Sequence, residues 1–272
     1  MNDFLLVLSF SIFPILTTII YATVIPPMGA ILYLKNEVML SIALPSFGSA
    51  VVAFCILIGV SENTIIQYVL VILFIFVMLN LLSIVYEKAG SLKKRELLLA
   101  AVFISGNAFT YLFMAISPHV NANISHLLSG EVLAIQLNNC VLIFIVSALL
   151  LALAYPYRGV IYAFCLNEES FMINVRHYKW VIVAYRFILA CWITSSILLI
   201  GPLLTTTLLI LPPLFCEKVS GMDRFFTINI IIGVSSVTIG FITALIIDFP
   251  PTYVISITFL IIGGIGILLA PK

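Results

Sequence analysis

The sequence predicts an all-α protein, a polytopic transmembrane helix bundle of about eight or nine membrane segments. Its 272 residues are 63% hydrophobic and 8% charged, whereas a soluble domain has about 25% charged residues. So few charges cannot cover a globule of this size, and the mean hydropathy is +1.28. The composition therefore excludes a soluble enzyme, a nucleic-acid binder and a disordered chain. We expect residues 1–272 to form a single transmembrane domain.

The helices follow from the apolar runs, because a spanning helix needs about 20 apolar residues to cross a hydrocarbon layer roughly 30 Å thick. The runs are continuous rather than alternating, which disfavours a transmembrane barrel. We expect helices at residues 4–25, 39–60, 64–86, 97–117, 139–157, 179–200, 225–247 and 252–270. A shorter apolar stretch at 201–216 is expected to form a half-length or re-entrant element. Pro26 and Pro27 follow the first helix, and proline removes a backbone donor, so we expect a kink or break there.

The basic residues indicate the orientation of the chain. All Lys and Arg residues except Arg186 lie in alternate connections: Lys35, Lys88, Lys93, Lys94, Arg95, Arg158, Arg176, Lys179, Lys218, Arg224 and Lys272. The opposite connections carry Asp3, Glu62, His119, His126, Glu131 and Asp248, with no Lys or Arg. The positive-inside rule places the basic connections in the cytoplasm. The N-terminus is then outside and the C-terminus cytoplasmic, which requires an odd number of crossings and therefore a crossing by 201–216.

Arg186 is the one base inside an apolar run, and it follows the start of its helix near Lys179. One interpretation is that its side chain extends back to the cytoplasmic interface. The other is an internal ion pair that couples this helix to the loop before it.

Motifs for catalysis or for binding ATP are missing from the sequence. It contains no G-x-S-x-G, no H-E-x-x-H and no phosphate-binding G-x-x-x-x-G-K-[ST], so energy from ATP must come from another chain. The spans hold few ionisable residues, which disfavours a proton-driven pump. The five cysteines are scattered through apolar runs and never form C-x-x-C, which favours small buried hydrophobes over disulfides or zinc ligands. Such a bundle is typical of a channel, a structural subunit or the membrane half of a multi-subunit transporter.

Two motifs in the C-terminal third favour the last of these classes. Residues 200–213 read IGPLLTTTLLILPP, and residues 248–252 read DFPPT. They resemble the glycine-led, proline-closed stretch and the D-x-P-x-G-x-x entry to the last helix in ABC permeases that import zinc, manganese or iron. The segment GEVLA at 130–134 is similar to a short segment before the fifth span in that family. The resemblance covers roughly residues 20–270 in the same order.

Broken backbone at membrane depth is tolerated only where it is buried in protein or lines a polar cavity. The resemblance therefore implies a broken element at the transport pathway, formed by Gly201, Pro202, Thr205, Pro212 and Pro213. The alternatives are an ordinary proline-kinked packing helix and threonine hydroxyls that bond to carbonyls of their own helix.

The cytoplasmic segment at 166–176 reads LNEESFMINVR and stands where the family has F-D-E-E-x-A-x-x-x-G. The resemblance implies that it is the coupling helix that enters a cleft of the ATPase. Asn167 is a suitable N-cap, and Glu168 and Glu169 favour the helix dipole. Phe171 with Met172 would supply an apolar knob for the partner. The alternative is a solvated interfacial loop.

The second span departs from the family, which usually has G-D-A-x-S-H-x-x-L-P-G, with Asp and His facing the pathway. Aligned on Leu44 and Pro45, those positions are Glu37 and Ser41. They are the candidate metal residues, although a hydroxyl is a poor replacement for imidazole as a zinc ligand. Glu37 could instead end the cytoplasmic turn beside Lys35.

The resemblance implies a permease subunit of an ABC importer in the cytoplasmic (inner) membrane of a bacterial-type cell, moving a divalent metal ion or metal complex. Its partners would be ABC ATPase subunits, an extracytoplasmic substrate-binding protein, a second permease copy or paralogue, and the lipid bilayer, without nucleic acid. We expect no cofactor on this chain and no catalysis by it, with ATP and magnesium on the ATPase. The alternatives are a stand-alone channel or secondary transporter, a non-transporting scaffold subunit, and an intramembrane enzyme that would depend on His119 and His126.

Overall fold

A computed structural model describes residues 2–60, 65–89, 92–116, 158–166, 171 and 178–269. Within these ranges all regular structure is helical, which confirms the all-α prediction. The described ranges contain nine helices: α1 (Asn2–Leu34), α2 (Leu40–Leu57), α3 (Ile65–Ala89), α4 (Leu92–Ile116), α7 (Arg158–Leu166), α9 (Tyr178–Ile200), α10 (Pro202–Phe215), α11 (Met222–Ile247) and α12 (Pro251–Leu269). The helix expected at 139–157 lies outside the described residues.

Six of these helices are long and apolar enough to cross a membrane: α1, α2, α3, α4, α9 and α11. Helices α10 and α12 are shorter apolar helices. Large apolar side chains on the outer faces of α3 and α4 are exposed, for example Ile65, Leu73, Ile104 and Leu112. Exposed apolar faces of this size are unfavourable in water, so they are the surfaces that lipid covers in a multi-pass membrane protein.

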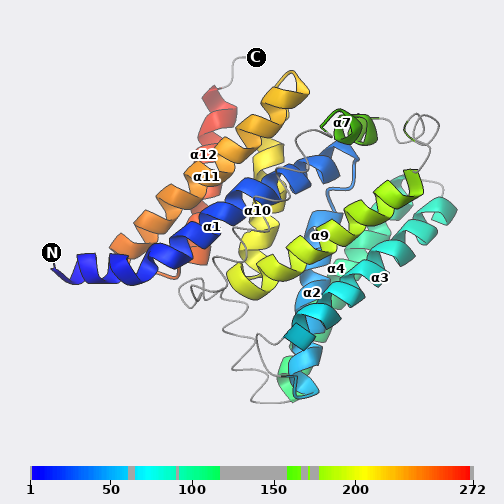
Figure 1. The fold of residues 1–272 in the computed structure, drawn as a ribbon, viewed down its shortest axis with the longest axis horizontal. Helices are drawn as coiled ribbons and strands as arrows, with labels where there is room; N and C mark the ends of the chain where they lie inside the picture. Colours follow the sequence, from blue (N-terminus) through cyan, green and yellow to red (C-terminus); the bar gives the residue numbers. More distant parts are fainter. Residues whose placement is uncertain are drawn as a thin grey trace.

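The bundle has two groups of helices, visible in Figure 1. Helices α1, α10, α11 and α12 pack together, and α2, α3, α4 and α9 form the other group. Helix α10 joins the groups, because it packs on α2 and α9 as well as on α1 and α12. The shared core contains fully buried side chains from both groups: Leu44, Ile75, Ile193, Leu204 and Phe241.

Of the kink or break expected at the proline pair, a break does not occur, because α1 continues through Pro26 and Pro27 to Leu34. Proline at 26 deprives the carbonyl of Ala22 of its usual amide donor. A Cβ built on Gly233 of α11 would lie 2.7 Å from that oxygen, so the α11 backbone packs directly against it. Packing between α1 and α11 therefore supports the helix where its own hydrogen bonds are missing.

Helices α9 and α10 are separated by one residue, Gly201, whose φ of 84° and ψ of 158° lie in a region that essentially only glycine adopts. Pro202 is the first residue of α10. An amide at this position has no acceptor within the helix, so the amide hydrogen that proline lacks costs no helical hydrogen bond. Helix α10 has 14 residues, about 21 Å at the usual rise of 1.5 Å per residue. It matches the short element expected at 201–216.

Candidate functional site

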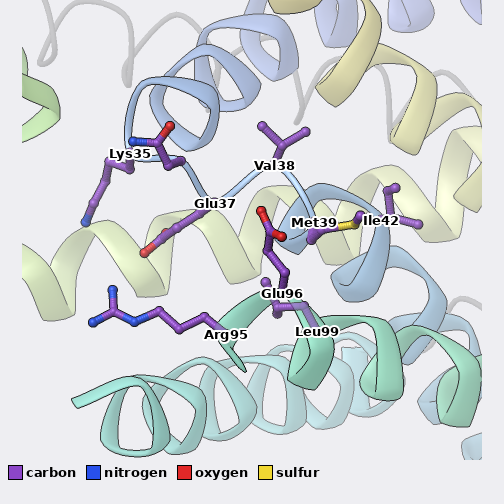
Figure 2. A pocket seen from close by; sticks show the side chains of 9 residues that line it. Lys35, Glu37, Val38, Met39, Ile42, Arg95, Glu96 and Leu99 are labelled. Atoms are coloured by element: carbon purple, nitrogen blue, oxygen red, sulfur yellow. The ribbon is translucent and has the colours of Figure 1, made fainter. Parts of the chain in front are cut away.

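A pocket of about 250 Å³ lies between the α1–α2 turn and the start of α4, as Figure 2 shows. Nine residues line it: Lys35, Asn36, Glu37, Val38, Met39, Ile42, Arg95, Glu96 and Leu99. The turn is held by backbone bonds from the Glu37 amide to the Leu32 carbonyl at 2.8 Å and from the Leu40 amide to the Glu37 carbonyl at 2.9 Å. Asn36 takes a left-handed conformation with φ of 56°, which asparagine tolerates better than most residues. The tight turn therefore brings the side chain of Glu37 to the pocket wall.

The charges around this pocket are mixed. Figure 2 shows the Glu37 carboxylate pointing to the side of the pocket on which Lys35 and Arg95 lie, with Glu96 across from it. Two bases beside a carboxylate reduce its attraction for a further cation. The arrangement favours the interpretation in which Glu37 ends the cytoplasmic turn beside Lys35.

Ser41, the other candidate metal residue, is buried, with 1% of its surface exposed, and does not line this pocket. The structure thus places Glu37 at the pocket and Ser41 inside the bundle. In the described part of the chain, no group of three or more His, Cys, Asp or Glu residues could hold a metal ion. His119 and His126 lie outside the described residues.

The broken element is buried in the centre of the bundle. Leu204 and Thr205 are fully buried, and Pro212 and Pro213 are buried near its end. The Thr205 hydroxyl donates to the Gly201 carbonyl at 2.8 Å, so the carbonyl at the break has a hydrogen-bond partner within the same element. Helix α10 therefore packs as protein interior on one face, while Leu203 and Leu214 are exposed. Its threonine hydroxyls bond to carbonyls of the same element, as the second alternative expected.

Thr207 of α10 makes the one contact to another helix among these hydroxyls. Its Oγ1 donates to the Leu203 carbonyl at 2.8 Å and lies 3.2 Å from the Ser256 hydroxyl of α12. This polar pair fixes the register of α10 against α12 within an apolar interface.

Of the four residues expected in the coupling helix, Asn167, Glu168 and Glu169 lie outside the described residues. Phe171 is described, and it is 2% exposed. Its ring lies 5.4 Å from that of Phe164 in an edge-on arrangement, within a cluster that includes Ile182. Phe171 therefore packs against its own chain, and its role as an apolar knob for a partner stays a prediction.

Arg186 of α9 has neutral partners on α3. Its two terminal nitrogens donate to Asn80 Oδ1 at 3.1 Å and to Ser83 Oγ at 2.7 Å. Among the described residues, the guanidinium bridges α9 and α3 through neutral side chains rather than an ion pair, and its extension to the cytoplasmic interface stays a prediction. No spacing pattern predicts a contact between Arg186 and residues so far away in the sequence. The polar residues Asn80 and Ser83 on one face of the apolar helix α3 were a signal that this face has a polar partner.

Helix α7 makes two further contacts that sequence reasoning missed. The Tyr162 hydroxyl donates to Asp223 Oδ1 of α11 at 2.6 Å. Lys35 Nζ lies 4.1 Å from the centroid of the Phe164 ring, a cation–π contact. Both join residues distant in sequence, and a short aromatic-rich segment gives no indication of which helices it will contact.

Comparisons with known proteins agree with this architecture. A family model described as the ABC 3 transport family matches residues 9–268. The high-affinity zinc uptake system membrane protein ZnuB of Buchnera aphidicola subsp. Acyrthosiphon pisum (strain APS) is 30% identical over 148 residues, 53% of this chain and 56% of that protein. This chain thus aligns with about half the length of that relative.

A solved structure has the same fold. In PsaBC from Streptococcus pneumoniae in complex with Fab, one chain superposes with a TM-score of 0.81, covering 100% of this chain and 96% of that chain. The sequence identity is 17%, so this likeness concerns the fold. The family match spans nearly the whole sequence, from within α1 to within α12. The chain therefore belongs to the ABC 3 transport family.

Proposed function

We propose that this chain is the membrane permease subunit of an ABC importer that moves a divalent metal ion or metal complex into the cell. The observation that carries the proposal is the family match over residues 9–268, which includes the broken element and the segment after α7. The zinc-uptake relative supports a metal as the class of cargo. The chain itself is a multi-pass protein of the inner membrane.

The arrangement of the helices supports the N-out, C-in orientation. In Figure 1 the ends of α1 and α12 and the starts of α4, α9 and α11 lie toward one end of the bundle. Those helix ends adjoin the basic positions Lys35, Lys93, Lys179 and Lys218. The positive-inside rule assigns this end to the cytoplasm, so the pocket at Glu37 and helix α7 would face the ATPase.

Energy would come from partner ATPases that bind ATP and magnesium, while this chain performs no chemistry. Two permeases, identical or paralogous, would form the pathway, and an extracytoplasmic binding protein would deliver the cargo. Movement of the coupling segment would open the pathway to one side at a time, which is alternating access between two discrete arrangements.

In this proposal Ser41 does not form a tight zinc site, and the cargo passes the second span without losing its water or its other ligands there. A hydroxyl and a carboxylate are suited to a hard or hydrated cation, whereas a metal held in an organic chelator brings its own ligands. Replacing Ser41 with His should create zinc binding if the alignment of the second span is right. Metal analysis of the purified wild type, Ser41→His and Glu37→Ala checks this. Stoichiometric zinc that survives Glu37→Ala in the otherwise native chain would place the site elsewhere.

Reconstitution tests the function directly. The chain and its cognate ATPase and binding protein, placed in lipid vesicles, should take up radioactive zinc, manganese or iron only when ATP is supplied on the ATPase side. The matched control is the same complex with the ATPase replaced by a hydrolysis-deficient variant. Uptake by the permease alone without ATP would instead support a channel or secondary transporter.

A further inference from the structure

Helix α7 directly precedes the predicted coupling segment in the chain and contacts two separate parts of the bundle. Its residues Tyr162 and Phe164 are two positions apart, and residues so spaced point to nearly opposite sides of a helix. One side of α7 therefore contacts α11, and the other contacts α9 and the end of α1. Figure 1 shows α7 at the end of the bundle where these helices meet.

The contact with α11 combines a hydrogen bond and a ring stack. Tyr162 donates to Asp223 Oδ1 at 2.6 Å, and its ring stacks on Phe226 at 5.6 Å with an interplanar angle of 21°. Asp223 lies in the first turn of α11, where a carboxylate is favoured by the helix dipole. A short hydrogen bond to a carboxylate is among the stronger side-chain contacts, so α7 is attached to the first turn of α11.

The contact on the other side is an aromatic cluster. Phe164 is buried and meets Tyr185 of α9 edge-on at 5.3 Å, and Phe171 of the following segment at 5.4 Å. Lys35, which follows α1, lies over the same ring. Edge-on aromatic pairs at this separation add stability beyond the area that they bury. Phe164 thus ties the segment that holds Phe171 to α9 and to the α1–α2 turn.

The two contacts reach different helix groups. Helix α11 packs on α1 and α12, whereas α9 packs chiefly on α3. Among the described residues, Phe171 connects the predicted coupling segment to α7. A displacement of that segment therefore reaches both groups through α7.

We propose that α7 is a latch that transmits movement of the coupling segment to α11 through Tyr162 and Asp223, and to α9 and the α1–α2 turn through Phe164. Tyr162 is then a positioning residue for coupling rather than part of the pathway. The inference rests on the proposed function, because it requires an ATPase that moves the coupling segment. The free energy that couples two distant sites in a protein is small enough for the loss of one side-chain contact to change it.

The test compares coupling in the reconstituted complex with its ATPase and binding protein. Tyr162→Phe keeps the ring but removes the donor, and Asp223→Ala removes the acceptor, whereas Asp223→Asn keeps an oxygen acceptor. The first two should lower the metal transported per ATP hydrolysed by about fivefold or more while ATP hydrolysis continues. Asp223→Asn should retain more of the wild-type ratio of metal transported to ATP hydrolysed. A merely structural defect would lower transport and hydrolysis together.

Two variants serve as matched controls. Tyr253→Phe removes a hydroxyl from a half-exposed tyrosine of α12, and Thr227→Ala removes a hydroxyl that bonds to the Asp223 carbonyl within α11 at 2.7 Å. Both should keep the wild-type ratio of metal to ATP. A wild-type ratio in Tyr162→Phe and Asp223→Ala would overturn the latch while leaving the proposed function intact.

Hydrogen exchange on the purified full chain gives a second readout that needs no ATPase. Tyr162→Phe and Asp223→Ala should each speed amide exchange in residues 158–166 by about tenfold, since α7 loses a charge-assisted contact. Unchanged exchange would overturn the attachment itself. If the wild-type complex shows no ATP-dependent uptake, the proposed function and the transmission role are both refuted. If only the variants behave like the wild type, the latch alone is refuted.

Discussion

At the scale of single residues, the bridge between Arg186 and α3 is the contact with the clearest energetic consequence. A partly buried guanidinium between apolar helices is unfavourable unless hydrogen bonds replace the water that it loses. Asn80→Ala removes one acceptor, and bonds to charged groups contribute about 1.5–3 kcal/mol each. We therefore expect a lower unfolding temperature for this variant, measured by tryptophan fluorescence in detergent.

Asn107 of α4 supplies the matched control for this variant. Its side chain donates to the Phe103 carbonyl at 3.1 Å, just as that of Asn80 donates to the Phe76 carbonyl at 2.8 Å. Among the hydrogen bonds of the two side chains, the bond from Arg186 to Asn80 is the difference. Asn107→Ala should leave the unfolding temperature nearly unchanged, and equal shifts in both variants would show that the arginine contributes nothing.

Cys165 reports on the packing of α7. Burial raises the pKa of its thiol to about 12, and the nearby Lys35 lowers it only in part. Only the thiolate reacts, and an unfolded cysteine has a pKa of about 8.5, so the folded thiol carries roughly a thousandfold less thiolate at pH 8. In a chain whose other cysteines are alanine, iodoacetamide should react slowly at pH 8 and steadily faster up to about pH 12.

Unfolding the same protein in detergent should restore the reactivity of an ordinary thiol, with a rate that levels off once the pH exceeds about 9. Equal rates in the folded and unfolded chain at pH 8 would mean that α7 is not packed against the bundle.

At the scale of elements, the contact between α1 and α10 depends on the absence of a side chain. A Cβ at Gly29 would overlap the Leu209 carbonyl and lie 2.8 Å from the Leu209 Cα, and backbone atoms cannot rotate away. Gly29→Ala should force the helices apart, at about 1–3 kcal/mol for overpacking. A Cβ at Gly264 of α12 meets nothing within 4 Å, so Gly264→Ala is the control. Fluorescence-detected size exclusion should show loss of folded protein for Gly29→Ala and not for Gly264→Ala.

The helices themselves could be predicted because each apolar run must satisfy its backbone internally. The helix expected at 179–200 is found at Tyr178–Ile200, and the short element expected at 201–216 is α10. Of the kink or break expected at Pro26, a break does not occur, because α11 packs against the freed Ala22 carbonyl and local proline chemistry gives no sign of that packing. Helix ends therefore depend on neighbouring helices as well as on the local sequence.

The direction of side chains was harder to predict than the helices. Phe171 was expected to face a partner, and it packs on Phe164 of its own chain. Arg186 was expected at the interface or in an ion pair, and it binds Asn80 and Ser83. An apolar ring or a single base in a helix has several faces available, and only the arrangement of distant helices decides which one is used.

At the scale of the whole molecule, the direction of α10 determines the topology. A helix of 14 residues is shorter than the roughly 20 needed to span alone, but the surrounding helices bury one face of it, including Leu204, Leu208 and Leu209. Backbone ends at membrane depth are tolerated where protein packs against them. If α10 crosses, the positions before α9 and after α10 lie on the same side of the membrane.

Cysteine labelling of membrane vesicles tests this topology. Lys179 and Lys218 are exposed and lie on either side of the α9–α10 pair, and Phe249, 61% exposed, lies between α11 and α12. In a cysteine-free chain, Lys179→Cys and Lys218→Cys should react with an impermeant maleimide only from the cytoplasmic face, and Phe249→Cys only from outside. The reason is the cost of moving bases across the membrane, about 2.5–3.5 kcal/mol for each Lys or Arg at its centre. Labelling of Lys218→Cys from outside, with Lys179→Cys still inside, would make α10 a re-entrant element. Reversal of all three labels would invert the orientation and remove α7 and its latch from the ATPase side.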